Sequence, residues 1–222
     1  AKHEEGMVLH GSGWPLSETH SNGGWWLYFD ENNQVSFGMV IDLAYHNPYL
    51  SPFDELQRLK THPLIRNILE GGKRLSYGAR ALTKGGLNSL PKLYFAGGVL
   101  VGDDAGFLNP AKIKGTHTSI KSGMLAAEAI YEAIAAGRQH DEVASYEQKF
   151  KASWLYNDMY AARNFATAMH RMGIWMGGAF NFLEQNLFKG KMPLTIHDKM
   201  PDYDVLERAD HAYIPEYPKP DG

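Results

Sequence analysis

The first fifth of the chain alternates apolar and other residues with the period of two that is typical of β-strands. From Val35 to Ile41 every second residue is apolar, which indicates a strand with one buried face. The turn-forming run Asp30–Asn33 separates it from an aromatic stretch, Trp25–Phe29, and this order predicts a hairpin. We therefore predict antiparallel strands within residues 7–45.

Short helices are predicted next. Ser51 and Pro52 are typical of a helix start, and the helix should continue to about Lys60. A second helix around residues 64–69 would end at a pair of glycines. Strand-like residues then follow over 74–82.

The central segment combines a strand, a glycine-rich turn and a helix. Leu93–Val101 is almost continuously apolar, as expected of a strand covered on both faces. A helix is predicted from about Thr116 to Ala136, and its small residues Gly123 and Ala126 suit close packing on a sheet. One face of that helix carries Ile120, Met124, Ala127, Tyr131 and Ile134.

Two more helices are predicted, over about 141–163 and 165–188. In the second, the uncharged stretch 172–183 is too short to cross a hydrocarbon core of ~30 Å. Its aromatic and methionine residues lie between basic flanks, which favours a helix in the membrane interface. Gly173 and Gly177 have the spacing of a close helix contact. A buried core helix explains the same pattern.

Composition narrows the function classes. A hydrophobic content of 44% with 21% charged residues suits a folded chain, and the net charge of -3 argues against nucleic-acid binding. The absence of cysteine excludes disulfides and cysteine-ligated zinc or iron–sulfur centres within this chain. The ten histidines form no metal-binding motif, so no metal site is predicted. Neither a nucleophile elbow nor a P-loop is present.

The turn after the central strand suits a flavin. A strand that ends in Gly102-Asp103 places a carboxylate at the carboxyl edge of a sheet, where α/β proteins bind ligands. The helix that begins near Thr116 directs unpaired N–H groups and a partial positive charge at its ligand. Such a helix end would stabilise the electron-rich edge of a reduced flavin. An ordinary β-turn-α unit is the alternative.

The sequence Asn22–Trp26 contains two glycines before two tryptophans. The glycines expose main-chain groups beside flat apolar surface, and a quinone uses both features. A tight strand entry with core tryptophans is the alternative, and the residues alone favour it over a quinone site.

Together these segments resemble the electron-transfer flavoprotein–ubiquinone oxidoreductase family. The matching stretches follow one another in family order and cover nearly the whole chain. They are Gly13–Leu16, Gly23-Gly24, Asn47–Phe53, Thr61–Pro63, Glu70–Arg74, Tyr77–Arg80, Lys112–Thr118, Lys121–Glu128 and Glu216–Gly222.

The resemblance implies a monotopic membrane enzyme that passes electrons from electron-transfer flavoprotein to ubiquinone, using FAD and a 4Fe-4S cluster. The membrane would be the bacterial or mitochondrial inner membrane. The implied fold is α+β, with part of a glutathione-reductase-like FAD domain, an antiparallel-sheet quinone-binding domain and membrane-surface helices. We expect a quinone-binding portion over 1–90, the second half of the FAD domain with the membrane helix over 91–192, and an extended linker over 193–222.

The resemblance also implies site residues. Gly23 and Gly24 would contact ubiquinone, and electron transfer requires no catalytic acid or base. The expected FAD contacts are Gly102, Asp103, Gly106, Asn109, Gly115, Thr116, His117 and Thr118. The expected membrane contacts are Phe165, Met169, Met172, Trp175, Met176 and Phe180.

The chain departs from the family pattern in three ways. It lacks both the Gly-x-Gly-x-x-Gly motif, which binds the FAD diphosphate, and the four cysteines that would hold the cluster. We therefore expect an internal fragment that retains FAD poorly. Trp25-Trp26 stands where the family has a small residue and an aromatic. Asn109–Ala111 replaces the usual Asn-Val-Pro. The alternatives are another flavoprotein, such as a geranylgeranyl-reductase-like enzyme, and a non-catalytic membrane-surface protein.

Overall fold

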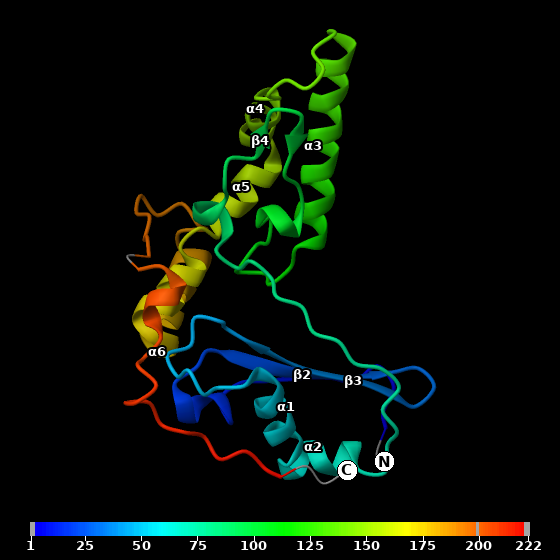
Figure 1. Cartoon of the computed structure of the whole chain (residues 1–222), viewed down its shortest axis with the longest axis vertical. Coiled ribbons are helices and arrows are strands. Elements are labelled where there is room, and N and C mark those ends of the chain that lie inside the picture. The colour runs from blue at the N-terminus through cyan, green and yellow to red at the C-terminus, as the bar shows by residue number, and fades with distance from the viewer. Residues whose placement is uncertain (1–2, 199, 220–222) are drawn as a thin grey trace. The chain divides into compact units, whose positions relative to one another are not determined.

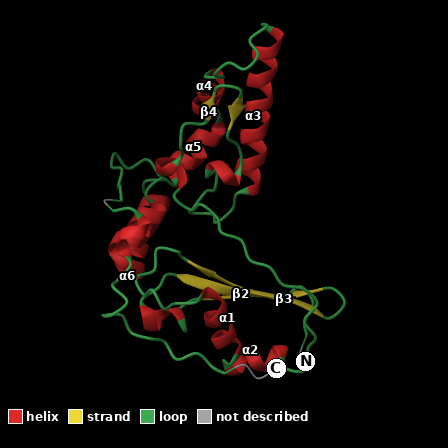
Figure 2. Cartoon of the chain, in the orientation of Figure 1, coloured by secondary structure: helices red, strands yellow, loops and turns green. Residues whose placement is uncertain are grey.

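The computed structural model describes residues 3–198 and 200–219. It confirms the α+β class, because helices are mixed with two small antiparallel sheets (Figure 2). The chain divides into two compact units, one formed by residues 3–77 with 200–219 and one by residues 78–198 (Figure 1). Lys199 and the last three residues of the Glu216–Gly222 motif lie outside the described residues.

The first unit contains a three-stranded antiparallel sheet in the order β1-β2-β3. Its strands are β1 (Val8–Gly11), β2 (Gly23–Asp30) and β3 (Gln34–Ile41). The predicted hairpin is confirmed, because β2 and β3 pair along their whole length. Asn32 and Asn33 have φ angles of 59° and 55°, the left-handed values that a tight hairpin turn requires.

Two helices pack on one face of this sheet. They are α1 (Pro52–Lys60) and α2 (Pro63–Leu69), as the sequence predicts. Ser51 caps α1 by accepting a hydrogen bond from Asp54 N at 3.3 Å. The apolar core between helices and sheet is Leu27, Phe29, Leu59 and Ile65.

Residues 74–82 are not a strand, so that prediction is wrong. They are exposed and have no regular structure. An isolated β-pattern does not form a strand without a hydrogen-bonded neighbour, and these residues have none among those described. A 3-10 helix, Gly86–Ser89, follows.

The predicted strand Leu93–Val101 is only partly correct. Two two-residue strands, β4 (Tyr94–Phe95) and β5 (Gly98–Val99), pair antiparallel. Gly97 reverses the chain between them with a φ of 77°, a value that glycine adopts without strain. Phe95 is exposed, so the stretch is not covered on both faces.

The helix predicted from Thr116 is α3 (Thr116–Ala135), the longest uninterrupted helix of the second unit. Its packed face consists of small and apolar residues such as Leu125, Ala126 and Ala129, which lie in the core with Phe107 and Tyr146. The face predicted to be apolar is instead exposed to solvent. Its exposed members include Ile120, Met124, Tyr131 and Ile134.

The helix predicted over 141–163 is two helices. They are α4 (Ser145–Ala152) and α5 (Trp154–Ala161), and they lie near α3 (Figure 1). The break occurs at Ser153, whose backbone is extended with a ψ of 163°. Ser153 Oγ donates to Phe150 O at 2.8 Å, and such side-chain bonding competes with helix continuation.

The helix α6 (Phe165–Asn186) is a hairpin of two helical halves, because its backbone is non-helical at Gly173. Asn181 Nδ2 donates to Phe165 O at 3.0 Å, although these residues would be about 24 Å apart along an unbroken helix. At the crossing, a Cβ on Gly177 would lie 2.6 Å from Ala168 O. Gly177 therefore makes the predicted close helix contact, and Gly173 provides the turn.

Buried polar side chains fix the base of this hairpin. Asn164 Nδ2 donates to Glu184 Oε1 at 2.6 Å and joins the two halves. Arg163 is 2% exposed, and its guanidinium donates to Gly190 O at 2.8 Å and Leu194 O at 3.0 Å. A buried charge needs such partners, so Arg163 holds residues 190–194 against the hairpin base.

Candidate functional site

The Gly23-Gly24 pair begins β2, the central strand of the sheet, beyond the point where its ladder with β1 ends; we call this place the glycine edge. On one side it pairs with β3, where Gly23 is opposite Ile41 and Gly24 is opposite Val40. On the other side the ladder with β1 ends at Gly11 opposite Trp25. Neither glycine therefore has a strand partner on the β1 side among the described residues. Main-chain groups at such an edge are available to a ligand.

Both glycines are also required by the packing of the sheet. A Cβ on Gly24 would lie 2.7 Å from Gly11 O, and one on Gly23 would lie 2.2 Å from Val40 O. These contacts involve backbone atoms, which cannot move aside without disturbing the ladder. The structural explanation for the pair therefore holds whether or not a ligand binds.

The two tryptophans lie on opposite faces of the sheet, each over a glycine of a neighbouring strand. Trp25 packs against the α1–α2 core and covers Gly11. Trp26 covers Gly38 on β3, where a Cβ would lie 2.2 Å from its ring. Trp26 is half-buried and beside Tyr28, with ring centroids 6.5 Å apart. An aromatic surface therefore borders the glycine edge on that face.

A charged network fixes the segment before β2. Glu18 lies in the 3-10 helix Leu16–Thr19 and accepts hydrogen bonds from Arg58 at 2.6 Å and Trp14 Nε1 at 2.9 Å. The hydrogen bond from Arg58 lowers the pKa of Glu18 from its ordinary value, against a weaker effect of burial. This network joins the entry of β2 to α1, because Arg58 belongs to that helix.

The turn that the sequence assigns to FAD has two glycines with positive φ, of which Gly106 is buried. Gly102 has a φ of 65°, and its N–H donates to Ser122 Oγ of α3 at 2.9 Å. Asp103 follows at the start of a 3-10 helix (Asp103–Ala105) and is half-buried. Gly106 ends that helix with a φ of 92°. Asp103 is therefore the residue next to Gly102, whose N–H bonds to α3.

The start of α3 contains the other four predicted FAD residues. Gly115 is the N-cap, and the first helical hydrogen bond runs from Ser119 N to its carbonyl at 2.8 Å. The N–H groups of Thr116, His117 and Thr118 precede that bond, so they are the unpaired donors of a helix start. Thr116 is exposed and His117 half-buried. Thr118 is fully buried, and its hydroxyl contacts Phe107 O and Gly115 O instead of solvent.

Asn109 is engaged within the chain. Its Oδ1 accepts from Ala111 N and Lys112 N, both at 3.1 Å, and its Nδ2 donates to Asp158 Oδ2 at 2.9 Å. It is 2% exposed. The side chain therefore shapes the loop before α3, and its contact with FAD stays a prediction.

Asp158 of α5 is a residue that sequence reasoning missed. It binds Lys112 and Asn109, and His117 Nε2 lies 3.3 Å from its Oδ2. The His117 ring also stacks on Trp154 at 6.2 Å. Partial burial would raise the pKa of Asp158, but these hydrogen bonds outweigh it and lower that pKa. No local pattern reveals this group, since its partners are over 40 residues away.

The predicted membrane residues fall into two groups. Trp175 is 88% exposed and Met176 is also exposed, at the turn of the α6 hairpin. Phe165, Met169, Met172 and Phe180 are half-buried within it. Exposed apolar residues that the prediction missed are Ile174, Phe182 and Leu183.

Two searches of the described part of the chain gave negative results. No helix there is long and apolar enough to cross a membrane. No group of three or more histidine or acidic residues in residues 3–198 and 200–219 is arranged to hold a metal ion.

Comparison with known proteins points to one family. Residues 1–82 match the family model described as the ubiquinone-binding domain of electron-transfer flavoprotein–ubiquinone oxidoreductase. The chain is 59% identical to a probable electron transfer flavoprotein-ubiquinone oxidoreductase of Acinetobacter baylyi and 59% identical to the enzyme of that name from Pseudomonas aeruginosa. It is 44% identical to the mitochondrial protein of that name from Bos taurus.

These alignments include the whole of this chain but only part of each relative. The chain spans 42%, 40% and 37% of the three proteins, respectively. The resemblance seen in the separate motifs is thus confirmed over the full alignment. The chain belongs to the electron-transfer flavoprotein–ubiquinone oxidoreductase family, of whose curated members it spans about two fifths.

Proposed function

We propose that the chain supplies the quinone-binding edge and the flavin-facing helix of an enzyme that transfers electrons from reduced electron-transfer flavoprotein to ubiquinone. The Gly23-Gly24 edge carries this proposal. It combines main-chain groups without a strand partner on the β1 side, a half-buried tryptophan, and a family match over the same residues. A quinone carbonyl would accept a hydrogen bond from a glycine N–H, and its ring would lie on apolar surface.

The start of α3 fits the FAD of the proposed reaction. Three unpaired N–H groups and the positive end of a 20-residue helix suit the electron-rich edge of a flavin. The half-buried Asp103 carboxylate suits the hydroxyls of a ribityl chain. When bound, FAD would accept electrons and release them one at a time. The residues of this chain would hold the flavin ring and exclude water from it.

The exposed apolar face of α3 supports the assignment of this unit to an FAD domain. A face with Ile120, Met124, Tyr131 and Ile134 in solvent is costly, because apolar area is stabilised by burial. In the longer relatives, the remaining residues of the glutathione-reductase-like domain would cover it.

The 4Fe-4S cluster does not fit this chain. Such clusters are held by cysteine thiolates, and the chain contains no cysteine. Its ligands would come from another part of the enzyme, and no residue described here takes part in holding it.

The α6 hairpin is the proposed membrane contact. Its turn presents Ile174, Trp175 and Met176 to solvent, and its base is fixed by buried polar side chains. An exposed tryptophan beside aliphatic residues suits the interface between lipid headgroups and acyl chains. The membrane would be a bacterial or mitochondrial inner membrane.

The quinone assignment can be tested without mutation. The chain would be labelled with ¹⁵N-glycine and titrated with ubiquinone-0, which has the ring but no isoprenoid tail. We expect the amide signal of Gly23 or Gly24 to shift in proportion to ligand bound. Gly178, which lies in the second unit and where an added Cβ would meet nothing within 4 Å, is the control. Equal shifts at Gly178, or none at the glycine pair, would refute the assignment.

A further inference from the structure

The C-terminal strap, defined here as residues 200–219, is attached to the loop between β3 and α1. His46 Nδ1 donates to Val205 O at 2.9 Å, and Glu207 N donates back to His46 O at 2.8 Å. Farther along, Asn47 Nδ2 donates to Tyr213 O at 2.7 Å and Ser51 N donates to Tyr217 Oη at 2.9 Å. The strap and the loop are both in the first unit, although their partners are about 160 residues apart in sequence.

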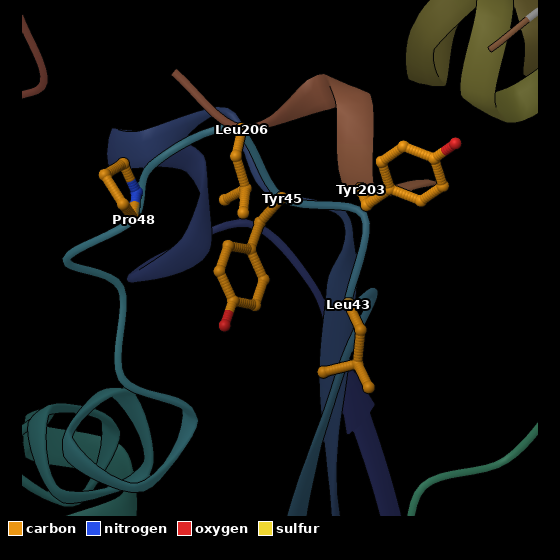
Figure 3. Close-up of a pocket in the computed structure, with 5 residues that line it drawn as sticks. All are labelled: Leu43, Tyr45, Pro48, Tyr203 and Leu206. Atoms are coloured by element: carbon orange, nitrogen blue, oxygen red, sulfur yellow. The ribbon is translucent and has the colours of Figure 1, made fainter. Parts of the chain in front are cut away.

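The strap forms one wall of a small pocket. The pocket has a volume of about 230 Å³ and is lined by Leu43, Tyr45, Pro48, Tyr203 and Leu206 (Figure 3). The two hydrogen bonds to His46 flank Leu206 and so fix its position. In Figure 3 the Leu206 side chain points toward the Tyr45 ring, while Leu43 lies below on the continuation of β3.

The lining determines which ligand suits this pocket. No charged side chain lines it, so an ionic ligand would lose hydration without a charged partner to compensate. Leu206 is 49% exposed, and burying an aliphatic side chain against a hydrocarbon is favourable. The volume is below the range of ~300–1,000 Å³ typical of sites for whole drug-sized ligands. A short stretch of hydrocarbon chain fits better than a substituted ring.

The pocket begins close to the glycine edge. Ile41 is the strand partner of Gly23, and Asp42 N donates to Asn22 O at 2.9 Å. Leu43 follows two residues after Ile41, a distance of about 7 Å along an extended chain. A quinone ring at the glycine pair would therefore have the pocket within reach of its side chain.

We propose that this pocket binds the first isoprenoid units of the ubiquinone tail, with the strap as its outer wall. The inference rests on the proposed quinone site at Gly23-Gly24. The preference for a quinone with a tail would then be set by residues from two distant parts of the sequence. These are Leu43 and Tyr45 after β3, and Tyr203 and Leu206 in the strap.

The test compares quinones that differ only in tail length. Binding of ubiquinone-0 and ubiquinone-2 to the chain would be measured by quenching of tryptophan fluorescence. We expect ubiquinone-2 to bind at least about tenfold more tightly, since its first isoprenoid units bury apolar surface. Leu206→Gln should remove most of this preference and leave the affinity for ubiquinone-0 unchanged. Leu64→Gln is the matched control, because Leu64 is 48% exposed in the same unit and outside the pocket.

The substitution Leu206→Gln could detach the strap from the loop, so a second measurement uses the unmodified chain. Leucine methyl signals of the unmodified chain should shift for Leu43 and Leu206 on addition of ubiquinone-2, and remain fixed on addition of ubiquinone-0. Equal affinity for both quinones, or a tail preference that survives Leu206→Gln, would overturn the pocket assignment alone. Equal loss of both affinities in the variant would also overturn it. If neither quinone binds the unmodified chain, the quinone site and the pocket fail together.

Discussion

At the scale of the residue, several side chains predicted to bind a cofactor are used by the fold itself. Thr118 bonds to Phe107 O, and Asn109 joins its own loop to Asp158. Their sequence positions beside a helix start predict ligand contact, but burial decides how a side chain is used. For Asn109 the bonding partner lies on α5, which no pattern near residue 109 reveals.

The Asp158 cluster gives a prediction about stability. Asp158→Ala should lower the free energy of unfolding by about 1–3 kcal/mol, because it leaves the amide of Asn109 short of an acceptor and removes the partner of Lys112. Urea denaturation would measure the loss. Asp104→Ala is the control, since Asp104 and its partner Arg80 are both exposed and 3.7 Å apart; it should cost less than about 0.5 kcal/mol.

The same cluster predicts a pH dependence. The pKa of Asp158 is lower in the folded chain than in the unfolded chain, so its contribution is complete above the unfolded value of about 4 and is lost as the pH falls through the folded value. The difference between the unmodified chain and Asp158→Ala should therefore be constant from about pH 5 to 7 and shrink below about pH 4. A difference that grows on acidification would contradict this.

At the scale of the element, local patterns identified most boundaries and missed the interruptions. The β2–β3 hairpin, α1 and the start of α3 follow from turn residues, a Ser-Pro cap and a glycine N-cap. The break at Ser153 and the reversal at Gly173 were not predicted. The helical period of the sequence continues through both positions unchanged. The first break accompanies a local hydrogen bond from Ser153 Oγ to Phe150 O, and the second depends on contacts between the two halves of α6, such as Asn181 with Phe165.

The α6 hairpin predicts opposite effects for two adjacent glycines. Gly177→Ala should destabilise the chain by about 1–3 kcal/mol, because the new Cβ would lie 2.6 Å from Ala168 O. Gly178→Ala meets nothing within 4 Å and should stabilise the helix by up to about 1 kcal/mol. Thermal unfolding followed by circular dichroism separates them. Equal effects would mean that residues 165–186 form one straight helix.

The same hairpin predicts which residue controls membrane binding. Trp175→Ser should reduce flotation with anionic liposomes about tenfold or more, because a large aromatic side chain leaves the interface. Tyr77→Ser is the control, since Tyr77 is 85% exposed in the first unit. Unchanged flotation in the Trp175 variant would exclude the hairpin turn as the contact.

At the scale of the whole molecule, the family could be predicted from scattered motifs, whereas the return of residues 200–219 to the first unit could not. The motifs follow one another in order, and the alignments with relatives confirm them. The association of residues 200–219 with residues 3–77 depends on hydrogen bonds such as Asn47 with Tyr213. Such long-range pairing leaves no periodic signal in a sequence, and the extended linker predicted over 193–222 gave no indication of it.

A missing sequence motif predicts that the purified chain retains flavin weakly. The proposed FAD residues would contact only the ring and the ribityl chain, and the chain lacks a Gly-x-Gly-x-x-Gly motif for the diphosphate. The purified chain should therefore show much less than one flavin per molecule by visible absorbance. Near-stoichiometric flavin would show that a complete site is present.

The central claim is that this chain supplies the ubiquinone-binding part of an electron-transfer flavoprotein–ubiquinone oxidoreductase. The most direct test replaces the matching segment of the Pseudomonas aeruginosa relative, 59% identical over 223 residues, with this chain and measures electron transfer from reduced electron-transfer flavoprotein to ubiquinone-1. We predict a rate within about tenfold of that relative, because the glycine edge and the start of α3 are supplied intact. A chimera whose flavin is reduced by the partner but which does not reduce ubiquinone-1 would contradict the claim.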